Sequence, residues 1–261
     1  ETFTLVTGIR MDYHSLFKEY LTYRLSGMFK VDAFTLRGGY SSGFRSPTLK
    51  ELYTNWFHPW GGGFQIMGNK SLKPETSNNF TLSVDFNARK WNITAMTQYS
   101  KVKDKIAYRW TQASDTIRYV NFKGNTDIIS SEISATYRPS KYFRLKGSHA
   151  YYITSNSESD TRPHTLTAKV EYVEQSELKY LPNIILSGKW VSGSDIYEEK
   201  DTFTHYAPYS IWRLQLSKKL PYHFVVNAGI DNLFDYVTPT TSFYSSITPG
   251  RTYFVGLKWN L

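Results

Sequence analysis

Apolar and polar residues alternate with a period of two along most of this chain, and no other feature constrains its fold as strongly. The clearest example is residues 80–87, where Phe80, Leu82, Val84 and Phe86 alternate with Thr81, Ser83, Asp85 and Asn87. The same alternation recurs over 21–30, 212–217, 224–230 and 253–261. A period of two places alternate side chains on opposite faces of a β-strand. The sequence therefore predicts an all-β chain.

The alternating segments and their connections favour a membrane barrel. We predict twelve strands, at residues 2–13, 20–31, 33–45, 78–88, 90–110, 116–138, 142–153, 164–174, 183–193, 208–218, 222–231 and 251–260. Short links at 87–90, 138–141 and 218–221 alternate with longer polar links at 154–163, 194–207 and 232–250. Outer-membrane barrels have short periplasmic turns and long extracellular loops, and a soluble β-sandwich has no reason to show this asymmetry. The prediction is a transmembrane antiparallel β-barrel.

Composition agrees with membrane strands and argues against membrane helices. Aromatic residues make up 17% of the chain, yet its mean hydropathy is negative and no apolar run approaches the roughly 20 residues of a membrane helix. A membrane strand needs an apolar residue at only every second of about 10 positions. The chain has no cysteine, which fits an oxidising compartment. It begins at Glu1 without a signal peptide, so we expect a mature chain or a fragment of one.

The net charge of +9 is spread along the strands. Lysine and arginine form no block, so nucleic-acid binding is not expected. We expect the polar face of each strand to line the barrel interior, with these charged residues: Arg10, Arg24, Arg37, Asp85, Glu132, Arg144, Lys146, Lys169, Glu171, Lys189, Arg213 and Lys258. Such cations are either solvated in a water-filled lumen or paired with carboxylates of a domain that fills the barrel.

Two motifs flank the longest predicted loop, 46–77. The first reads Gly43-Phe44-Arg45-Ser46-Pro47-Thr48-Leu49-Lys50-Glu51, and the second reads Gly68-Asn69-Lys70-Ser71-Leu72-Lys73-Pro74-Glu75. The prolines remove amide donors where strand gives way to loop, and Glu51 and Glu75 can cap exposed amides. On this reading the motifs only shape the loop.

These motifs also resemble the paired boxes of TonB-dependent outer-membrane receptors. Phe44, Arg45 and Pro47 match the first box, with Ser46 where alanine is usual, and Asn69, Leu72, Pro74 and Glu75 match the second, with Lys70 and Ser71 replacing Pro-Asn. Asn232-Leu233-Phe234-Asp235 and Pro249-Gly250-Arg251 are similar to the last strands of the family. Leu261 stands where a terminal phenylalanine is usual.

The resemblance implies the architecture and the activity. The family's barrel has 22 strands around an N-terminal plug, so residues 1–261 are expected to be the C-terminal portion of such a barrel, its last twelve strands, with the plug missing from this chain. The implied function is active import of a scarce nutrient across the outer membrane of a Gram-negative cell. The implied partners are the TonB complex, outer-membrane lipid, a small-molecule ligand and a surface lipoprotein. We expect no enzyme activity, no catalytic residue and no cofactor of its own.

Haem or another iron complex is the expected cargo. Haem receptors of the family are similar in carrying a histidine in this loop, and His58 lies among the aromatic residues Trp56, Phe57, Trp60 and Phe64. Imidazole suits haem iron, and aromatic neighbours cover a porphyrin face. His205 and Tyr206, in the predicted loop 194–207, are further candidate ligand contacts.

Other functions stay open at this point. The cargo could be cobalamin or a siderophore, and His58 could simply pack the loop. A passive porin or a surface binding protein is the alternative from another class, and twelve strands could close as a barrel of their own. His149 points to lipid by parity, as in a membrane phospholipase, but no serine of matching parity supports a catalytic pair. His14 is expected near an extracellular tip, and His164 and His223, near strand starts, are expected to be structural.

Overall fold

In a computed structural model, residues 2–59, 63–111, 115–155, 161–173, 181–198, 202–238 and 248–259 are described. The elements are β1 (Thr2–His14), β2 (Lys18–Val31), β3 (Phe34–Arg45), α1 (Leu49–Tyr53), β4 (Asn55–His58), β5 (Phe64–Met67), β6 (Glu75–Asn87), β7 (Trp91–Lys103), β8 (Ile106–Trp110), β9 (Thr116–Asn121), β10 (Asn125–Tyr137), β11 (Phe143–Thr154), β12 (His164–Tyr172), β13 (Asn183–Val191), β14 (Ser194–Glu198), β15 (Thr202–Tyr206), β16 (Tyr209–Lys219), β17 (Phe224–Asp231) and β18 (Thr252–Trp259). No helix in this part of the chain is long and apolar enough to cross a membrane.

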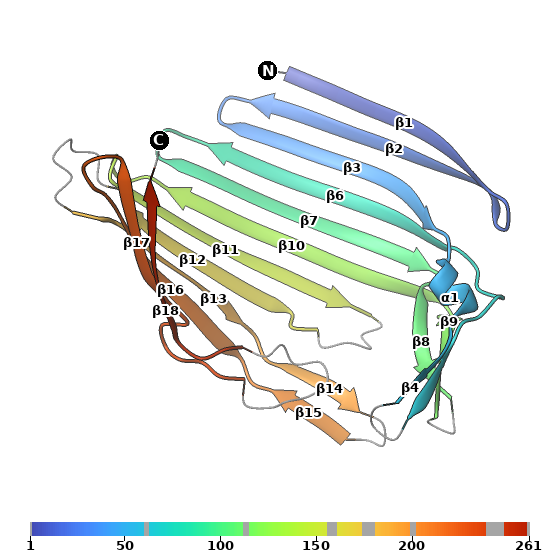
Figure 1. The fold of residues 1–261 in the computed structure, drawn as a ribbon. Coiled ribbons are helices and arrows are strands. Elements are labelled where there is room, and N and C mark those ends of the chain that lie inside the picture. The colour runs from blue at the N-terminus through green and yellow to red at the C-terminus, as the bar shows by residue number, and fades with distance from the viewer. Residues whose placement is uncertain are drawn as a thin grey trace. The chain divides into compact units, whose positions relative to one another are not determined.

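Twelve strands form one sheet in the hydrogen-bonded order β1-β2-β3-β6-β7-β10-β11-β12-β13-β16-β17-β18 (Figure 1). Each strand pairs with the next one that belongs to the sheet, as in an up-and-down barrel wall. The predicted all-β antiparallel fold is confirmed, and the predicted strands match these twelve. The remaining strands form a hairpin, β14-β15, and a four-stranded sheet, β4-β5-β9-β8. Strands β4, β5, β14 and β15 lie where the sequence predicted loops, whereas β8 and β9 lie within predicted wall strands.

Two predicted strands, 90–110 and 116–138, are each divided. Strand β7 ends at Lys103, and β8 begins at Ile106 after Asp104, whose φ is 55°. Strand β9 ends at Asn121, and β10 begins at Asn125 after Gly124, whose φ is 92°. A positive φ interrupts an extended strand. The outer halves therefore leave the wall and build a separate sheet.

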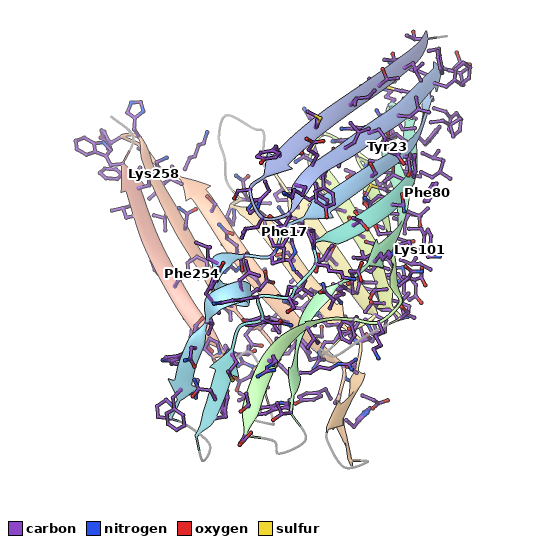
Figure 2. The ribbon with its side chains drawn as sticks, turned by 90° about the vertical axis from the view of Figure 1, so that its right-hand side faces the viewer. Phe17, Tyr23, Phe80, Lys101, Phe254 and Lys258 are labelled. Carbon is purple, nitrogen blue, oxygen red and sulfur yellow. The ribbon has the colours of Figure 1, made fainter. Side chains whose placement is uncertain are left out.

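The chain forms two compact units, one of Glu1–Ser83, Thr97–Ile129 and Thr154–Asn156, the other of Val84–Met96, Ser130–Ile153 and Ser157–Leu261. In the first unit the register pairs Phe3 with Phe29 and Ile9 with Tyr23, so apolar residues meet on one face. Figure 2 shows Tyr23 and Phe80 on the same side of the ribbon.

In the second unit, Val226 pairs with Leu257 and Ala228 with Val255. The apolar face of both units is open: Phe80 is 50% exposed and Val255 is 81% exposed. Exposed apolar residues at every second position are those that face lipid in a membrane wall, whereas a sandwich would bury them. The alternation therefore confirms the predicted outward apolar set.

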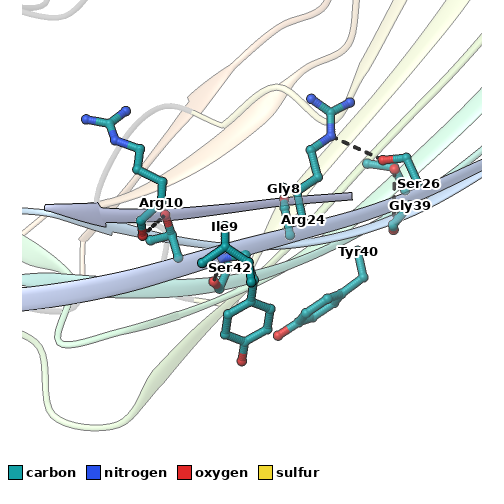
Figure 3. Close-up of a pocket in the computed structure, with 12 residues that line it drawn as sticks. Gly8, Ile9, Arg10, Arg24, Ser26, Gly39, Tyr40 and Ser42 are labelled. Carbon is teal, nitrogen blue, oxygen red and sulfur yellow. Dashed lines mark hydrogen bonds between the residues drawn. The ribbon is translucent and has the colours of Figure 1, made fainter. Parts of the chain in front are cut away.

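Figure 3 shows the same two-faced wall at close range. Arg10 and Arg24 point to one side of the sheet, whereas Ile9 and Tyr40 lie toward the other, around a hollow of about 440 Å³. Arg24 Nε donates to Ser26 Oγ at 3.1 Å. Only wall residues of β1, β2, β3 and β6 line this hollow. The candidate binding residues from the sequence lie elsewhere.

Candidate functional site

The first motif begins the long connection between β3 and β6 with a short, well-capped helix. Thr48 Oγ1 accepts a hydrogen bond from Glu51 N at 3.2 Å, and Glu51 Oε2 accepts one from Thr48 N at 2.7 Å. This reciprocal capping box satisfies two amides that the first turn of α1 would leave without partners. Pro47 is buried directly before the cap. The predicted capping role of Glu51 is confirmed.

The two motifs meet at Arg45. Its Nη2 donates to Glu75 Oε1 at 2.8 Å and its Nε donates to Glu75 Oε2 at 2.9 Å. Its Nη1 lies 3.0 Å from both carboxylate oxygens of Glu51. Glu75 Oε1 also accepts from Ile106 N at 2.6 Å. One guanidinium thus joins the end of β3, the helix, the start of β6 and the start of β8.

These contacts change the ionisation of Glu51. Its partial burial would raise the pKa, but hydrogen bonds from Thr48 N, from Thr48 Oγ1 and from Arg45, together with the charge of Arg45, outweigh burial. The pKa of Glu51 is therefore lowered from its ordinary value of 4.5. The carboxylate stays ionised wherever the outer surface is near neutral pH.

The second motif anchors the connection to the neighbouring one. Asn69 Nδ2 donates to Tyr119 O at 3.0 Å, and Asn69 Oδ1 accepts from Ser71 N at 2.9 Å. Leu72 is 3% exposed and packs with Leu52 and Ile106 in a small core. Pro74 is buried as well.

Two further contacts complete this anchorage. Asn121 forms reciprocal hydrogen bonds with the backbone of Lys73, at 2.8 and 2.9 Å. Phe44, from the first motif, stacks on Tyr20 with ring centroids 4.4 Å apart. The motif residues thus form a structural joint, which we call the motif joint: Phe44, Arg45, Pro47, Asn69, Leu72, Pro74 and Glu75.

The motif joint supports the four-stranded sheet, whose strands present two different faces. Strand β4 pairs with β5, β5 pairs in parallel with β9, and β9 pairs with β8. On one face, which we call the aromatic face, the ring of His58 stacks on Phe64 with centroids 4.7 Å apart and lies 5.0 Å from Trp56. Phe64 in turn contacts Trp110 at 5.0 Å.

The predicted haem residues are only partly brought together. Trp56, His58 and Phe64 share the aromatic face, while Phe57 lies on the opposite face by strand alternation. An added Cβ at Gly63 would lie 2.5 Å from the Phe57 ring, so Phe57 packs tightly over that glycine. Trp60 lies outside the described residues. Among the side chains that are described, no group of three or more His, Asp or Glu could hold a metal ion.

The opposite face carries charge that the sequence reasoning missed. Arg109 and Arg118 are directly opposed across β8 and β9, and both are exposed. The Arg109 guanidinium lies 4.7 Å from the ring centroid of Phe122, and Arg118 Nη2 lies 3.7 Å from Met67 Sδ. Gln65 Nε2 donates to Asn55 Oδ1 at 2.6 Å on the same face. We call this the arginine face. Only the pairing of β8 with β9 brings the two arginines together.

The other candidate contacts lie in the second unit, on the hairpin β14-β15. His205 Nδ1 and Asp195 Oδ1 are 2.6 Å apart, and both side chains are exposed. Tyr206 is 7% exposed, and the Arg162 guanidinium lies over its ring at 5.6 Å. Arg162 also donates to Ser192 O at 3.1 Å. Burial makes Tyr206 a packing residue of this hairpin and leaves His205 at its surface.

The two C-terminal motifs also meet. Asn232 Nδ2 donates to Tyr236 O at 2.6 Å and to Pro249 O at 3.1 Å. Asp235 Oδ1 accepts from Arg251 N at 2.6 Å. The buried Asn232 therefore closes the base of the connection between β17 and β18.

Several wall cations have carboxylate partners in the wall itself. Arg144 Nη1 lies 3.2 Å from Glu171 Oε2, and Lys169 Nζ lies 2.6 Å from Glu171 Oε1. Arg213 pairs with Asp231. The expected pairing of Arg37, Arg144, Lys146 and Arg213 with carboxylates of a plug stays a prediction.

The chain matches a known protein family over most of its length. The family model described as "TonB dependent receptor-like, beta-barrel" matches residues 1–233. This chain belongs to the TonB-dependent receptor family. Its place is the outer membrane of a Gram-negative bacterium, as predicted, because that is where the family resides.

Individual relatives of this TonB-dependent receptor are more distant. The iron-regulated outer membrane virulence protein of Vibrio cholerae is 37% identical over 108 residues, which are 41% of this chain and 16% of that protein. The ferrienterobactin receptor of Escherichia coli is 22% identical over 89% of this chain and 34% of its own length. A ferric enterobactin receptor of Pseudomonas aeruginosa superposes with a TM-score of 0.81 at 18% identity, covering 98% of this chain and 43% of that one. The chain thus spans less than half the length of these relatives.

Proposed function

We propose that this chain is part of a TonB-driven importer of an iron complex, and that the β4-β5-β9-β8 sheet contacts the cargo. The names of the relatives support iron: one is iron-regulated, and two are receptors for ferric enterobactin. The sheet lies in the connections β3 to β6 and β7 to β10, which are long and so belong outside the membrane. Cargo therefore meets this sheet before it reaches the wall.

The opposed pair Arg109 and Arg118 is the observation that carries the proposal. The two residues lie at paired positions of β8 and β9, on the same face of the sheet, and both are exposed. Each guanidinium can donate charge-assisted hydrogen bonds to an anion that reaches this face. The pair is therefore well suited to an anionic cargo.

Exposed arginines favour a cargo that is anionic and that carries aromatic rings. A ferric catecholate complex is anionic and carries flat aromatic rings, so guanidinium groups can bind its oxygens and stack on its rings. Met67 contacts Arg118, and Phe57 lies on the same face of the sheet, so both can supply apolar contact. We propose an anionic ferric siderophore as the cargo.

The test is a titration of the complete purified receptor with ferric enterobactin, in which binding is measured by the change in tryptophan fluorescence. Arg109→Gln with Arg118→Gln should weaken binding about 100-fold, because two charge-assisted hydrogen bonds of about 1.5 kcal/mol each are lost. Uptake of the radiolabelled complex should require TonB in wild-type cells and should fall in cells that carry this double variant.

The matched control is Lys123→Gln, which removes one exposed positive charge from the same connection but outside the sheet. It should change affinity less than about threefold, since a surface charge at a distance is screened. Equal losses in both variants would indicate a general electrostatic effect, and an unchanged double variant would reject the arginine face as the binding surface.

Haem is the second candidate cargo, favoured by His58 on the aromatic face. The imidazole is half-buried between Trp56 and Phe64, and a flat porphyrin could pack on the same row of rings. Iron would bind an imidazole nitrogen at the edge of the ring, which the stack on Phe64 does not cover. Haem is the second candidate because the names of two relatives specify ferric enterobactin.

A further inference from the structure

A row of aromatic rings crosses four neighbouring strands on the outward face of the first unit. Tyr23 of β2 contacts Tyr40 of β3 at 5.8 Å, Tyr40 contacts Phe80 of β6 at 4.9 Å, and Phe80 contacts Tyr99 of β7 at 6.3 Å. Tyr23 and Phe80 are about half exposed. Aromatic rows of this kind mark the boundary between acyl chains and head groups.

The row lies near the outer boundary of the membrane. In β2, residues 23–31 span about 27 Å along a strand that would be tilted by about 40°, or roughly 21 Å across the bilayer. That span nearly fills the apolar band of about 25 Å. The row also lies on the side of the long connections β3 to β6 and β7 to β10, which is the extracellular side.

Two lysines follow on β7, directly beyond this row. Tyr99, Lys101 and Lys103 alternate along β7, so their side chains share the outward face. Figure 2 shows Lys101 on the same side of the ribbon as Tyr23 and Phe80. Lys101 lies about 7 Å beyond Tyr99 along the strand, at the depth of the head groups. Both lysines are exposed, and among the described residues neither side chain forms an ion pair or a hydrogen bond.

On β6 and β10 polar residues contact the outer side of the row, whereas Leu21 and Met11 continue the apolar face on β2 and β1. Asn78 Oδ1 accepts from Tyr40 Oη at 2.6 Å, and Asp127 Oδ1 accepts from Tyr99 Oη at 2.5 Å. Glu19, on β2, has the same outward parity. Asp127 Oδ1 is therefore already engaged by Tyr99.

We propose that Lys101 and Lys103 bind the phosphate groups of lipid A in the outer leaflet. That leaflet consists of glycolipid whose phosphates lie just outside the acyl chains, where the two ammonium groups are placed. Lysines at the ends of membrane strands extend toward head groups while their methylene stems stay on apolar surface. The site would anchor the receptor wall to the anionic lipid at the level of the cargo-binding connections.

The test measures lipid A binding to the complete receptor in detergent by native mass spectrometry. Lys101→Gln with Lys103→Gln should weaken binding of diphosphorylated lipid A about 30-fold, the equivalent of about 2 kcal/mol for two lysines at an anionic surface. Lys101→Arg with Lys103→Arg should retain binding. The control pair Lys30→Gln and Lys258→Gln removes the same charge from the inward face and should bind as wild type.

Three outcomes would overturn the proposal. The glutamine pair could bind as tightly as wild type, the control pair could lose as much affinity, or dephosphorylated lipid A could bind as well as the phosphorylated form. Heat-modified mobility on gels establishes that each variant is folded. If the glutamine pair does not assemble, Lys101→Gln alone is measured against Lys30→Gln, with about a fivefold loss expected.

Discussion

Arg45 and Glu75 form a two-bonded ion pair although 30 positions separate them in the chain, with Nη2 to Oε1 at 2.8 Å and Nε to Oε2 at 2.9 Å. The same guanidinium reaches Glu51, six positions away. This relationship turns two separate sequence motifs into one joint. The stability of the four-stranded sheet should therefore depend on a single side chain.

Replacing Arg45 should loosen the connection from β3 to β6. In Arg45→Ala, the half-buried carboxylates of Glu51 and Glu75 lose their charged partner, which should cost about 2 kcal/mol of local stability. Hydrogen exchange of α1 and β5 amides measures this loss. Arg10→Ala is the control, because its ion pair with Asp12 is highly exposed and should contribute less than about 1 kcal/mol. Unchanged exchange in Arg45→Ala would contradict the role of the joint.

The stability of α1 should decrease at acid pH, because Glu51 is then protonated. Its pKa is lowered in the folded chain, so its contribution is fully present above its ordinary value of 4.5 and is lost as pH falls through the lower folded value. Hydrogen exchange of α1 should accelerate in that acid range. Glu51→Gln should be less stable at neutral pH and should show a flatter acid profile. An identical acid profile in the variant would assign the effect to another carboxylate.

Removing the imidazole of His58 separates haem ligation from packing. If His58 ligates haem iron, His58→Ala should weaken haem binding and shift the visible absorption band, while binding of metal-free porphyrin falls much less. A packing role predicts small and equal effects on both ligands. An unshifted haem spectrum in the wild-type receptor rejects haem as cargo.

Leu72 should be the most sensitive apolar position in the connection from β3 to β6. It is 3% exposed against Leu52 and Ile106, so Leu72→Ala should cost about 2–4 kcal/mol through the cavity it leaves. Protease cleavage of that connection in intact outer membranes reports the loss. The control is Leu49→Ala, at a residue that is 75% exposed, and the protease should cleave this variant no faster than wild type.

Much of the wall follows from local sequence alone. The alternation of Phe80, Leu82 and Val84 determines which face is apolar, because side chains of a strand point to opposite sides whatever its neighbours do. Short turns then join adjacent strands in order, which gives the antiparallel sequence of pairs. The capping box at Thr48 and Glu51 is equally local, since its spacing of three residues is visible in the chain.

The candidate site depends on contacts that cannot be predicted from local sequence patterns. Arg109 and Arg118 come together only because Asp104 and Gly124 turn two strand ends out of the wall, so that β8 and β9 pair. Strand alternation then places Phe57 and His58 on opposite faces, although they are adjacent in sequence.

The sequence by itself determined the membrane wall and its family, because period-two alternation and short motifs act within a few residues. Only the tertiary structure decided that Arg45 joins two motifs, that the arginines form one face, and that Tyr206 is buried. Those relationships join residues that are far apart in the chain, and their energies exist only once the backbone has brought the side chains within bonding distance.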